Sequence, residues 1–389
     1  MITLPRHIQE LRPILSQHAR ETGYSEQVLY YGFSQMFAHW NLQEFEAFLT
    51  REIPGFQAAD TSQFIDGRIS SEQRRSLLSC KTVSSLIMVT ASTVPSASFQ
   101  DIMLSLLLPV RITHRPSRHL VPLFESIRNW VAGLLPDFAS RWTITPTDHD
   151  DEQIRCLLAS HDAVNISGSD QTIAHYEQLI QELPIDKRPE CIAHGHRISA
   201  IIIRSHELNS LTKDDYDRIS IDASIWDQTG CLSPKCIFVE GSPDECIEFA
   251  QSLSHSLGKT ASLLPEIPPS PCELAARNNA ILMAQIDGAK IIRATQNHDI
   301  LIVYPQNFPF HPVLFPRTTT IWPVGNAIKA AMQLSPHGQC LASASPINDE
   351  EIEELSGAGF NRFCAFGKMQ DPPLTWFHDG IGTIAPLIK

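Results

Sequence analysis

Apolar positions follow two different patterns along the chain. In the first 80 residues they recur at helical spacing and include an aromatic-rich stripe formed by Val28, Tyr31, Phe33, Phe37 and Trp40. We interpret that stripe as core. From residue 83 onward, short apolar runs alternate with helical stretches, which is typical of parallel sheets with crossover helices. The pattern therefore predicts an α/β protein with an N-terminal helical segment.

The alternating elements fall into two sets. The first set has expected strands at 86–90, 110–113, 161–166 and 198–203, and the second has expected strands at 236–240, 300–304, 319–322 and 339–343. We place the break between the sets at about residues 203–230. The predicted organisation is an N-terminal helical segment (1–80), a first α/β domain (81–205), a second α/β domain (206–370) and a closing segment (371–389).

Length, charge and cysteine usage exclude several classes of protein. At 389 residues the chain is long for one hydrophobic core, so two domains are expected. The formal charge of −13 argues against a nucleic-acid-binding protein. No apolar run approaches the roughly 18 residues of a membrane helix, and the N-terminus lacks a signal-peptide pattern. The nine cysteines contain no C-x-x-C pair, which favours reduced thiols in a cytoplasmic protein.

Two clusters have residue types that can bind metal ions, and we interpret neither as a metal site. The segment from Asp148 to Glu152 is acidic, but acidic residues are commoner at a helix N-terminus. His194 and His196 flank Gly195 and could share an ion, yet the sequence shows no third ligand nearby. We therefore predict no metal.

The residues from Asp227 to Lys235 carry the clearest chemical signal. Asp, Gln, Gly, Ser and Pro crowd around Cys231, just before the apolar run 236–239 that we expect to be a buried strand. Cys231 would sit in a tight turn whose backbone N–H groups can face outward. A thiol there suits nucleophilic attack if its pKa falls below the usual ~8.5. The alternative, a small buried cysteine beside a turn, would leave the polarity of this turn unexplained.

Gly168 and Ser169 stand between an expected strand and an expected helix. That order places exposed N–H groups at the positive end of a helix, which is a natural phosphate site. A plain turn with a helix cap is the ordinary alternative. Together with the cysteine turn, this feature predicts a cleft between a nucleotide-binding domain and a cysteine-containing domain.

Several motifs then stand in a characteristic order. They are Val94-Pro95, Arg115-Pro116-Ser117, Gly168-Ser169, Ala193-His194-Gly195-His196-Arg197-x-Ser199, Asp227-Gln228-x-x-Cys231-x-Ser233-Pro234, Gly359-Phe360-Asn361-Arg362, Gly367-Lys368-Met369-Gln370 and Trp376-x-His378-Asp379-Gly380. Over about residues 85–385 the chain resembles the long-chain acyl-CoA reductases of the LuxC type, which belong to the aldehyde dehydrogenase superfamily. The cysteine and closing motifs are the more specific ones.

The resemblance implies an aldehyde-dehydrogenase-like fold, with two Rossmann-like α/β domains, parallel sheets and an active-site cleft between them. It implies reduction of an acyl thioester, carried by CoA or a carrier, to a fatty aldehyde. Cys231 would form the acyl-enzyme, with Gln228 shaping its turn, and NADPH or NADH in the first domain would deliver hydride. The implied cofactor-binding residues are Thr93, Pro95, Arg115, Pro116, Ser117, Gly168, Ser169 and Gly195.

The sequence departs from the superfamily pattern at three places. Where the aldehyde oxidisers carry a glutamate base, this chain has Ile192 and Ala193, which favours acyl reduction over oxidation to the acid. An oxyanion-binding asparagine is replaced by Thr93, a weaker donor. The lysine of the Lys-Pro-Ser element is Arg115, which with Arg118 and His119 could clamp a 2′-phosphate and so favours NADPH. A solvated loop at a strand end is the alternative for those three residues.

His378 and Asp379 form a second candidate pair. His378 would help to form the Cys231 thiolate or protonate the leaving thiol, and Asp379 would orient it. Trp376 would then be a wall for the acyl chain or the cofactor. A structural His-Asp pair in the closing segment is the alternative.

Two other classes of function remain open from the sequence. One is a cysteine acyltransferase or thioesterase without a redox step, and the other is a non-catalytic subunit that keeps the fold. For the reductase, the resemblance implies a homo-oligomer and a possible acyl-activating partner enzyme, with no nucleic-acid or membrane partner.

Overall fold

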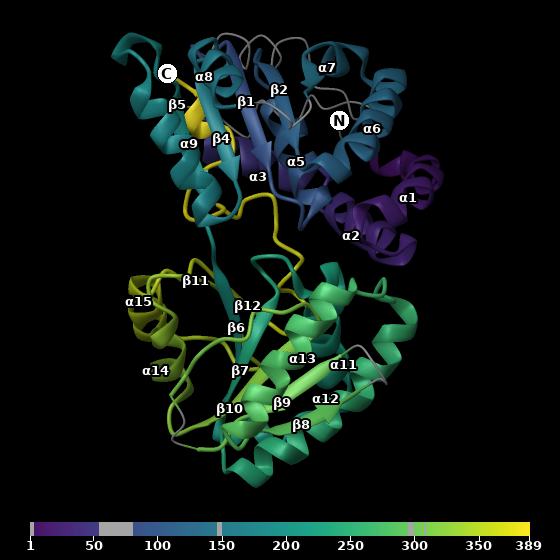
Figure 1. The fold of residues 1–389 in the computed structure, drawn as a ribbon, viewed down its shortest axis with the longest axis vertical. Helices are drawn as coiled ribbons and strands as arrows, with labels where there is room; N and C mark the ends of the chain where they lie inside the picture. Colours follow the sequence, from purple (N-terminus) through teal and green to yellow (C-terminus); the bar gives the residue numbers. More distant parts are fainter. Residues whose placement is uncertain (1–3, 54–80, 146–149, 295–298, 307–308) are drawn as a thin grey trace. The chain divides into compact units, whose positions relative to one another are not determined.

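The computed structural model describes residues 4–53, 81–145, 150–294, 299–306 and 309–389. The chain forms two compact units (Figure 1): unit 1 contains Met1–His196 and Pro373–Lys389, and unit 2 contains Arg197–Pro372. Cys80 and the first part of the acidic cluster, residues 148–149, lie outside the described residues. Asp150 caps the helix that follows it, as expected for an acidic helix N-terminus.

Unit 1 contains a five-stranded sheet in which every strand pair is parallel. The strand order β3-β2-β1-β4-β5 means that the chain starts at the middle strand and builds outward to each edge in turn. All carboxyl ends therefore lie at one edge of the sheet, where ligands bind in folds of this kind. The strands are β1 (Ser85–Thr90), β2 (Arg111–Pro116), β3 (Trp142–Ile144), β4 (Ala163–Ser167) and β5 (Glu190–His194).

Helices cover both faces of this sheet (Figure 1). On one face, α8 (Asp151–Ala159) and α9 (Asp170–Glu182) pack against apolar residues of β1 and β4. On the other face, α6 (Val121–Leu134) sets Phe124 edge-on against His114 of β2, with ring centroids 4.5 Å apart. Because both faces are covered, the central strand β1 reads as an apolar run in the sequence, whereas β2 contains three basic residues. The remaining helices of this sheet are α5 (Pro95–Ser105) and α7 (Pro136–Ser140).

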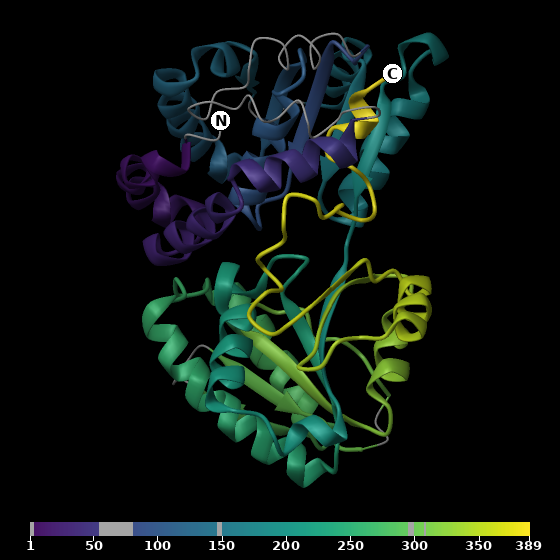
Figure 2. The same ribbon diagram turned by 180° about the vertical axis from the view of Figure 1, so that it is seen from behind.

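The N-terminal helices and the C-terminal segment both belong to unit 1. Trp40 stacks on Phe99 of α5, with ring centroids 5.8 Å apart, so the aromatic stripe packs on the sheet domain. Glu52 accepts three backbone N–H groups from residues 383–385, at 2.7, 3.0 and 2.7 Å. Figure 2 shows the helix that ends at Glu52 beside the yellow C-terminal segment. The three helices are α1 (Ile8–Thr22), α2 (Glu26–Ala38) and α3 (Leu42–Glu52).

Unit 2 contains a seven-stranded sheet in the order β12-β11-β6-β7-β10-β9-β8. The strand pairs are parallel except β8 with β9, which is antiparallel, so this sheet is parallel, as predicted, up to one antiparallel edge strand. The strands are β6 (Ile198–Ile203), β7 (Pro234–Glu240), β8 (Lys290–Arg293), β9 (Ile300–Val303), β10 (Thr318–Val324), β11 (Gly338–Ala342) and β12 (Arg362–Cys364).

The largest part of the unit 2 core lies between one face of this sheet and three helices, α13, α14 and α15. The other face is covered by α11 and α12, which also pack against each other. The helices are α10 (Ser205–Leu208), α11 (Lys213–Ser224), α12 (Pro243–Leu263), α13 (Pro271–Ile286), α14 (Ala327–Ala331) and α15 (Asp349–Gly357).

The structure corrects two predictions about organisation. The strand β6, which we predicted as the end of the first domain at residue 205, is a central strand of the unit 2 sheet. All six of its residues are buried, so its apolar pattern fits either sheet equally well. The predicted break at residues 203–230 lies within unit 2. It contains the helix α11, whose side chains are mostly polar. The strands β3 and β8 were not predicted, because both are short and lie at sheet edges.

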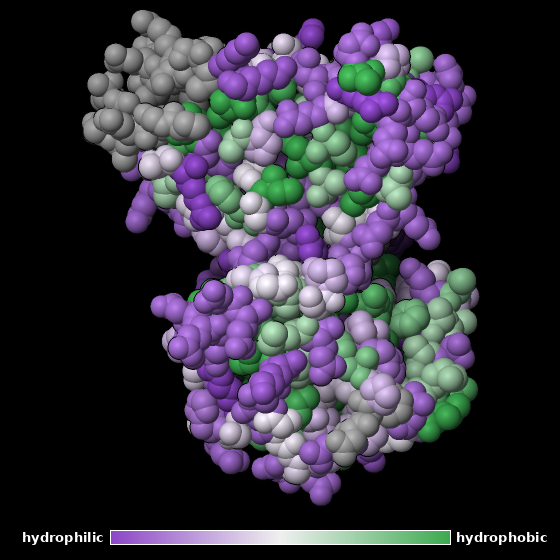
Figure 3. Space-filling model, turned by 90° about the vertical axis from the view of Figure 1, so that its left-hand side faces the viewer, coloured by the Kyte–Doolittle hydropathy of each residue, from purple (hydrophilic) through white to green (hydrophobic). Residues whose placement is uncertain are grey.

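None of the described helices combines the length and the apolar composition that a membrane crossing needs. On the face drawn in Figure 3, hydrophilic side chains dominate, with hydrophobic ones scattered among them. The eight cysteines within the described residues are all free thiols.

Candidate active site

The turn that carries Cys231 begins with three residues in an unusual backbone conformation. Trp226, Asp227 and Gln228 have φ angles of 55°, 48° and 60°, a region in which residues with side chains are strained. Thr229 closes the turn, because its N–H and its hydroxyl both donate to the Trp226 carbonyl, at 2.9 and 2.7 Å. Cys231 follows, half-buried, just before β7. Such strain persists only where the surrounding contacts fix it.

The first of these contacts is a buried ion pair. Nη2 and Nε of Arg317 donate to the Asp227 carboxylate at 2.7 and 2.9 Å, and the Arg317 N–H donates to the Asp227 carbonyl at 3.3 Å. Asp299 lies 3.4 Å from the same guanidinium. Burial raises the pKa of Asp227 to about 6, against the opposing charge of Arg317. The pair anchors the strained turn to the residue that precedes β10.

Gln228 is the second contact, and its side chain uses both ends of its amide. Nε2 donates to the Pro234 carbonyl and to the Thr319 hydroxyl, both at 2.6 Å. Oε1 accepts the Thr318 N–H at 2.7 Å. With no exposed surface, Gln228 connects the two ends of the turn to β10. These contacts fix the backbone on both sides of Cys231.

Two of the motifs found in the sequence reach the same turn from far along the chain. The Ser199 hydroxyl donates to the Cys231 carbonyl at 2.6 Å. Nε2 of Gln370 donates to the Ser233 hydroxyl at 2.7 Å. The residue types were visible in the sequence, but their partners were not.

Lys235 is the last polar residue of the stretch, and its side chain is buried. Its ammonium donates to the Gln228 carbonyl. Burial lowers the pKa of Lys235 to about 8, while the charge of Cys231 raises it. No role was predicted for Lys235 from the sequence.

In unit 1, the predicted cofactor residues lie at the carboxyl ends of β1, β2, β4 and β5. Pro95 is the first residue of α5, the helix that follows β1. The Thr93 carbonyl accepts a hydrogen bond from the Tyr24 hydroxyl at 2.7 Å. The N-terminal helices thereby help to hold this strand end.

The basic residues after β2 are not equivalent. Arg115 is 2% exposed, and its Nε donates to the Tyr176 hydroxyl at 3.2 Å. Pro116 ends the strand and Ser117 precedes a short 3-10 helix. Arg118 and His119 are exposed. The surface charge at this strand end therefore comes from the residues beyond Arg115.

The turn at Gly168 and Ser169 has the shape of a ligand cradle. Gly168 donates to the His194 carbonyl at 3.2 Å, and a Cβ there would lie 3.3 Å from Thr172. The Ser169 hydroxyl accepts the Thr172 N–H at 3.2 Å and so caps α9, a helix of 13 residues. A Cβ at Gly195 would lie 2.9 Å from Oδ1 of Asp170. The two glycines keep side chains away from the backbone beside this helix N-terminus, which fits a pyrophosphate.

His194, His378 and Asp379 form a cluster in unit 1. Nδ1 of His194 lies 3.0 Å from Oδ2 of Asp379, with side-chain exposures of 8% and 3%. The rings of His194 and His378 stack in parallel with centroids 4.4 Å apart, and the Trp376 ring lies 5.4 Å from that of His378. Asp379 thus contacts His194, and the His194 ring stacks on His378, the histidine that we predicted Asp379 to orient.

This cluster also offers three possible metal ligands whose atoms lie within 4.8 Å of one another. The sequence had shown only His194 and His196, two residues apart. A metal site needs ring nitrogens that converge on one point. Here the two rings lie face to face, and a nitrogen of His194 already faces Asp379. The geometry favours a hydrogen-bonded pair.

Three acidic residues near these sites were not predicted. Burial raises the pKa of the Asp101 carboxyl on α5 to about 6, and the charge of His194 opposes that rise. Glu52 holds the closing segment, as described above. Asp222 accepts the N–H groups of Gly367 and Met369 at 2.6 and 3.1 Å, and burial raises its pKa to about 7. Partners this distant in sequence leave no local pattern.

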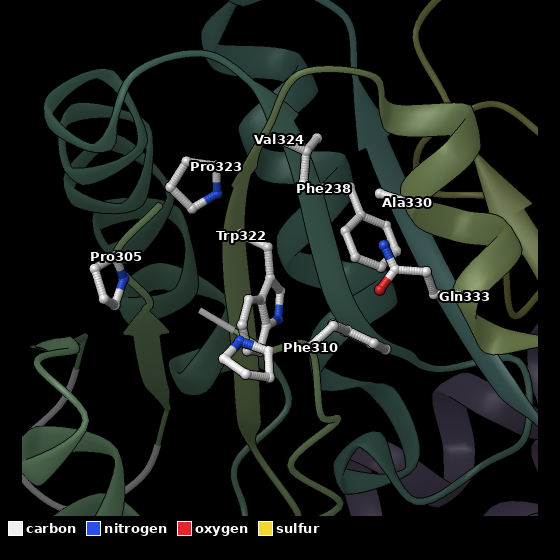
Figure 4. Close-up of a pocket in the computed structure, with 9 residues that line it drawn as sticks. Phe238, Pro305, Phe310, Trp322, Pro323, Val324, Ala330 and Gln333 are labelled. Atoms are coloured by element: carbon white, nitrogen blue, oxygen red, sulfur yellow. The ribbon is translucent and has the colours of Figure 1, made fainter. Parts of the chain in front are cut away.

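Unit 2 also contains a cavity of ≈ 350 Å³ (Figure 4), away from the cysteine turn. It is lined by the later residues of β7 and β10 and by the segments after β9 and in α14, including Phe238, Trp322, Pro305, Phe310, Ala330 and Gln333. Phe238, Trp322 and Ala330 belong to a core cluster of the unit, and Phe310 and Val324 pack against it. The cavity contains none of the predicted site residues.

Comparison with known proteins agrees with this architecture. A model of the acyl-CoA reductase (LuxC) family matches residues 8–389. No protein with a curated description matches the chain by sequence.

Solved structures share the fold. A glyceraldehyde-3-phosphate dehydrogenase from Methanocaldococcus jannaschii, complexed with NADP, has a TM-score of 0.65 and 12% identity, covering 94% of this chain and 79% of that one. A succinic semialdehyde dehydrogenase from Streptococcus pyogenes with NADP⁺ has a TM-score of 0.60 and 14% identity (92% and 82% covered). A salicylaldehyde dehydrogenase from Pseudomonas putida G7 has a TM-score of 0.64 and 12% identity, covering 94% of this chain and 76% of that one. The chain therefore has the aldehyde dehydrogenase fold.

Proposed function

The chain belongs to the acyl-CoA reductase (LuxC) family, and we propose that it reduces acyl thioesters to aldehydes through a covalent intermediate on Cys231, with NADPH as electron donor. The braced turn around Cys231 carries this proposal. Its strained backbone is held by Arg317, Gln228 and Ser199. A nucleophile that must keep an acyl group in place for a second step needs such a fixed position.

The chemistry proceeds on the sulfur atom of Cys231. The thiolate attacks the thioester carbonyl and expels the CoA or carrier thiolate, which leaves an acyl-enzyme. Bound NADPH would supply the hydride that reduces the acyl carbon. The C–S bond to Cys231 then breaks, so that the aldehyde leaves and the thiolate is regenerated. Backbone N–H groups of residues 230–232 are the donors that we assign to the oxyanion.

Unit 1 would hold NADPH at the carboxyl edge of its sheet. Gly168 and Ser169 would receive the pyrophosphate at the start of α9, and Gly195 would keep the neighbouring strand end open. The other contacts would come from Thr93, Pro95, Pro116 and Ser117. Arg118 and His119 would face the 2′-phosphate, with buried Arg115 supporting them from β2. Two of the similar structures contain NADP, which supports this assignment.

His378 would transfer a proton to the leaving thiolate. It is partly exposed, whereas the His194–Asp379 pair behind it is buried. That pair would set the position of the His378 ring through the stacking contact. The acid would then be His378, with His194 and Asp379 as its support.

The acyl-enzyme would be protected from hydrolysis. The strand positions that carry a glutamate base in the aldehyde oxidisers hold Ile192, which is buried, and Ala193. Neither can activate water. Hydride transfer would therefore be favoured over release of the free acid.

The substrate would be an acyl-CoA or an acyl-carrier thioester, delivered in some settings by an acyl-activating partner enzyme. Exposed free thiols at Cys156, Cys191 and Cys272 support a reducing, cytoplasmic location. Leu282, Met283 and Ile286 are exposed on α13, and an apolar patch of this kind supports self-association.

The test is NADPH oxidation by the purified protein with a series of acyl-CoAs, with trapping of the aldehyde product. Wild type is compared with Cys231→Ala and with Cys272→Ala, a matched variant at an exposed thiol. Incubation with acyl-CoA alone, followed by peptide mass spectrometry, reports the acyl-enzyme directly.

We expect aldehyde formation and acylated Cys231 in wild type and Cys272→Ala, and neither in Cys231→Ala. CoA release that depends on Cys231 without NADPH oxidation would replace the reductase by an acyltransferase or thioesterase. Aldehyde formation by Cys231→Ala would remove the covalent mechanism.

A further inference from the structure

Lys235 is a buried lysine beside the nucleophile turn. It is the second residue of β7 and is 7% exposed. Lysine is almost never buried to this extent without a partner for its charge. Its ammonium donates to the carbonyl of Gln228, whose own side chain is fixed by three hydrogen bonds. The positive charge is therefore held in place against the loop that carries Cys231.

One carbonyl does not compensate a buried positive charge, so the other groups around Lys235 matter. The neighbouring strands present hydroxyl side chains here, Ser199 on β6 and threonines on β10. Asp227 is the acid nearest in sequence, and its carboxylate is bound by Arg317. The hydrogen bond to Gln228 closes the loop of residues 228–235 around the ammonium. Between these two residues the chain has one ionisable side chain, the thiol of Cys231, and its charge acts on Lys235.

Two features of a fold usually stabilise a thiolate, and the turn of Cys231 offers one of them. Cysteines acquire a low pKa at helix N-termini or beside a cation. Cys231 is followed by the strand β7 and not by a helix, so the dipole of a following helix does not act on it. A neighbouring cation is the remaining device that this turn offers.

We propose that the Lys235 ammonium stabilises the thiolate of Cys231, which makes Lys235 a positioning residue of the reductase. The inference rests on the proposed function in taking Cys231 as the nucleophile. On ionisation the Cys231 proton goes to solvent and Lys235 keeps its own. Acylation removes the negative charge, and the Gln228 carbonyl then holds the ammonium until the aldehyde leaves. The returning thiolate is stabilised again, which assists C–S cleavage.

The experiment measures the reactivity of Cys231 without turnover. Protein is treated with iodoacetamide at pH values from about 5 to 10, and alkylation of the Cys231 peptide is followed by mass spectrometry. The exposed Cys272 is an internal reference. Wild type is compared with Lys235→Met, with Lys235→Arg, and with Lys329→Met, a control at an exposed lysine.

We expect an apparent pKa of Cys231 below ~8.5 in wild type. In Lys235→Met the apparent pKa should rise by about one unit, so that alkylation at pH 7 slows about tenfold. Lys235→Arg should keep most of the wild-type rate, and Lys329→Met all of it. The Cys272 peptide should react alike in every variant.

Three outcomes overturn the proposal: a Lys235→Met profile equal to wild type, an equal loss in Lys235→Arg, or a wild-type pKa at or above ~8.5. The wild-type pKa of Cys231 is measured without any variant, so it still tests the proposal if Lys235→Met does not fold. Failure of the proposed function is seen separately, as no NADPH oxidation by wild type or as aldehyde formation by Cys231→Ala.

Discussion

The two parts of the proposed site are built in opposite ways. In unit 2, the cysteine turn is held by side chains that are remote in sequence: Ser199 lies 32 positions from Cys231, and Gln370 lies 137 positions from Ser233. In unit 1, the turn before α9 is closed locally, since Ser169 caps the helix through a residue three positions away. The cysteine turn is fixed mainly by side chains that are remote in sequence, whereas the turn before α9 combines a local helix cap with one backbone hydrogen bond to the neighbouring strand end.

This difference matches the two tasks. A covalent nucleophile must present one atom in one place, and remote bonds that converge on its turn restrict that atom. A cofactor supplies hydrogen-bond partners of its own, so backbone N–H groups at a helix N-terminus are useful when they are left for the ligand. Substitutions in the cysteine turn should therefore affect stability and reactivity together. At the cofactor edge, the effect of a substitution on cofactor binding should be separable from its effect on stability.

The largest effect is expected from Arg317→Met. This change leaves Asp227 and Asp299 buried without their cation, and breaking a buried ion pair in this way costs about 3–5 kcal/mol. The free energy of unfolding from urea titration measures it. Arg218→Met, which removes an exposed pair with Asp214, should cost about 1 kcal/mol or less. A loss in Arg317→Met no larger than that of the control would show that the turn does not depend on this pair.

The second prediction concerns the opposite pH responses of the two units. Burial lowers the pKa of His114 in unit 1 to about 3. Between pH 6.5 and 3 the unfolded chain binds a proton at His114 that the folded one does not, which lowers the stability of unit 1 as the pH falls, by about 2 kcal/mol at pH 5. Asp101 in the same unit has a pKa raised to about 6 and offsets part of this loss. The pKa of Asp222 in unit 2 is raised to about 7. Its folded form keeps a proton that the unfolded chain releases, and unit 2 gains stability as the pH falls from 7 towards 4.

Hydrogen exchange of peptides from β2 and β7, corrected for the intrinsic pH dependence, would resolve the two units. His114→Leu should remove the acid sensitivity of unit 1, whereas His206→Leu, at an exposed position, should keep it. Parallel loss of protection in both units would contradict the assignment.

Much of the fold was predictable because apolar runs report burial. The strands β1, β4, β7 and β9 lie within a few residues of their predicted positions. The domain boundary was not predictable, because β6 is buried on both faces and its composition contains no information about which sheet it joins. The edge strand β8 was missed, since only two of its four residues are half-buried and the others are exposed.

The same distinction between local and remote signals applies to the site residues. Cys231, Gly168 and Ser169 could be proposed as site residues from the sequence because their signal is local: turn residues next to an apolar run. Arg317 and Glu52 could not be found, because an arginine or glutamate looks the same whether it faces solvent or a partner 90 or 331 positions away. The strained φ angles of residues 226–228 also have no signature, as none of the three is glycine.

The smallest effect should separate stability from binding most clearly. Ser169 caps α9 in unit 1 and Ser242 caps α12 in unit 2 in the same way, each through the N–H three residues on. Replacing either by alanine should cost about 1 kcal/mol of stability. Only Ser169→Ala should also raise the KM for NADPH, by about fivefold, as the loss of one hydrogen bond of about 1 kcal/mol would. Equal KM values in both variants would remove this strand end from the cofactor site, and an equal rise in both would show that KM follows stability alone.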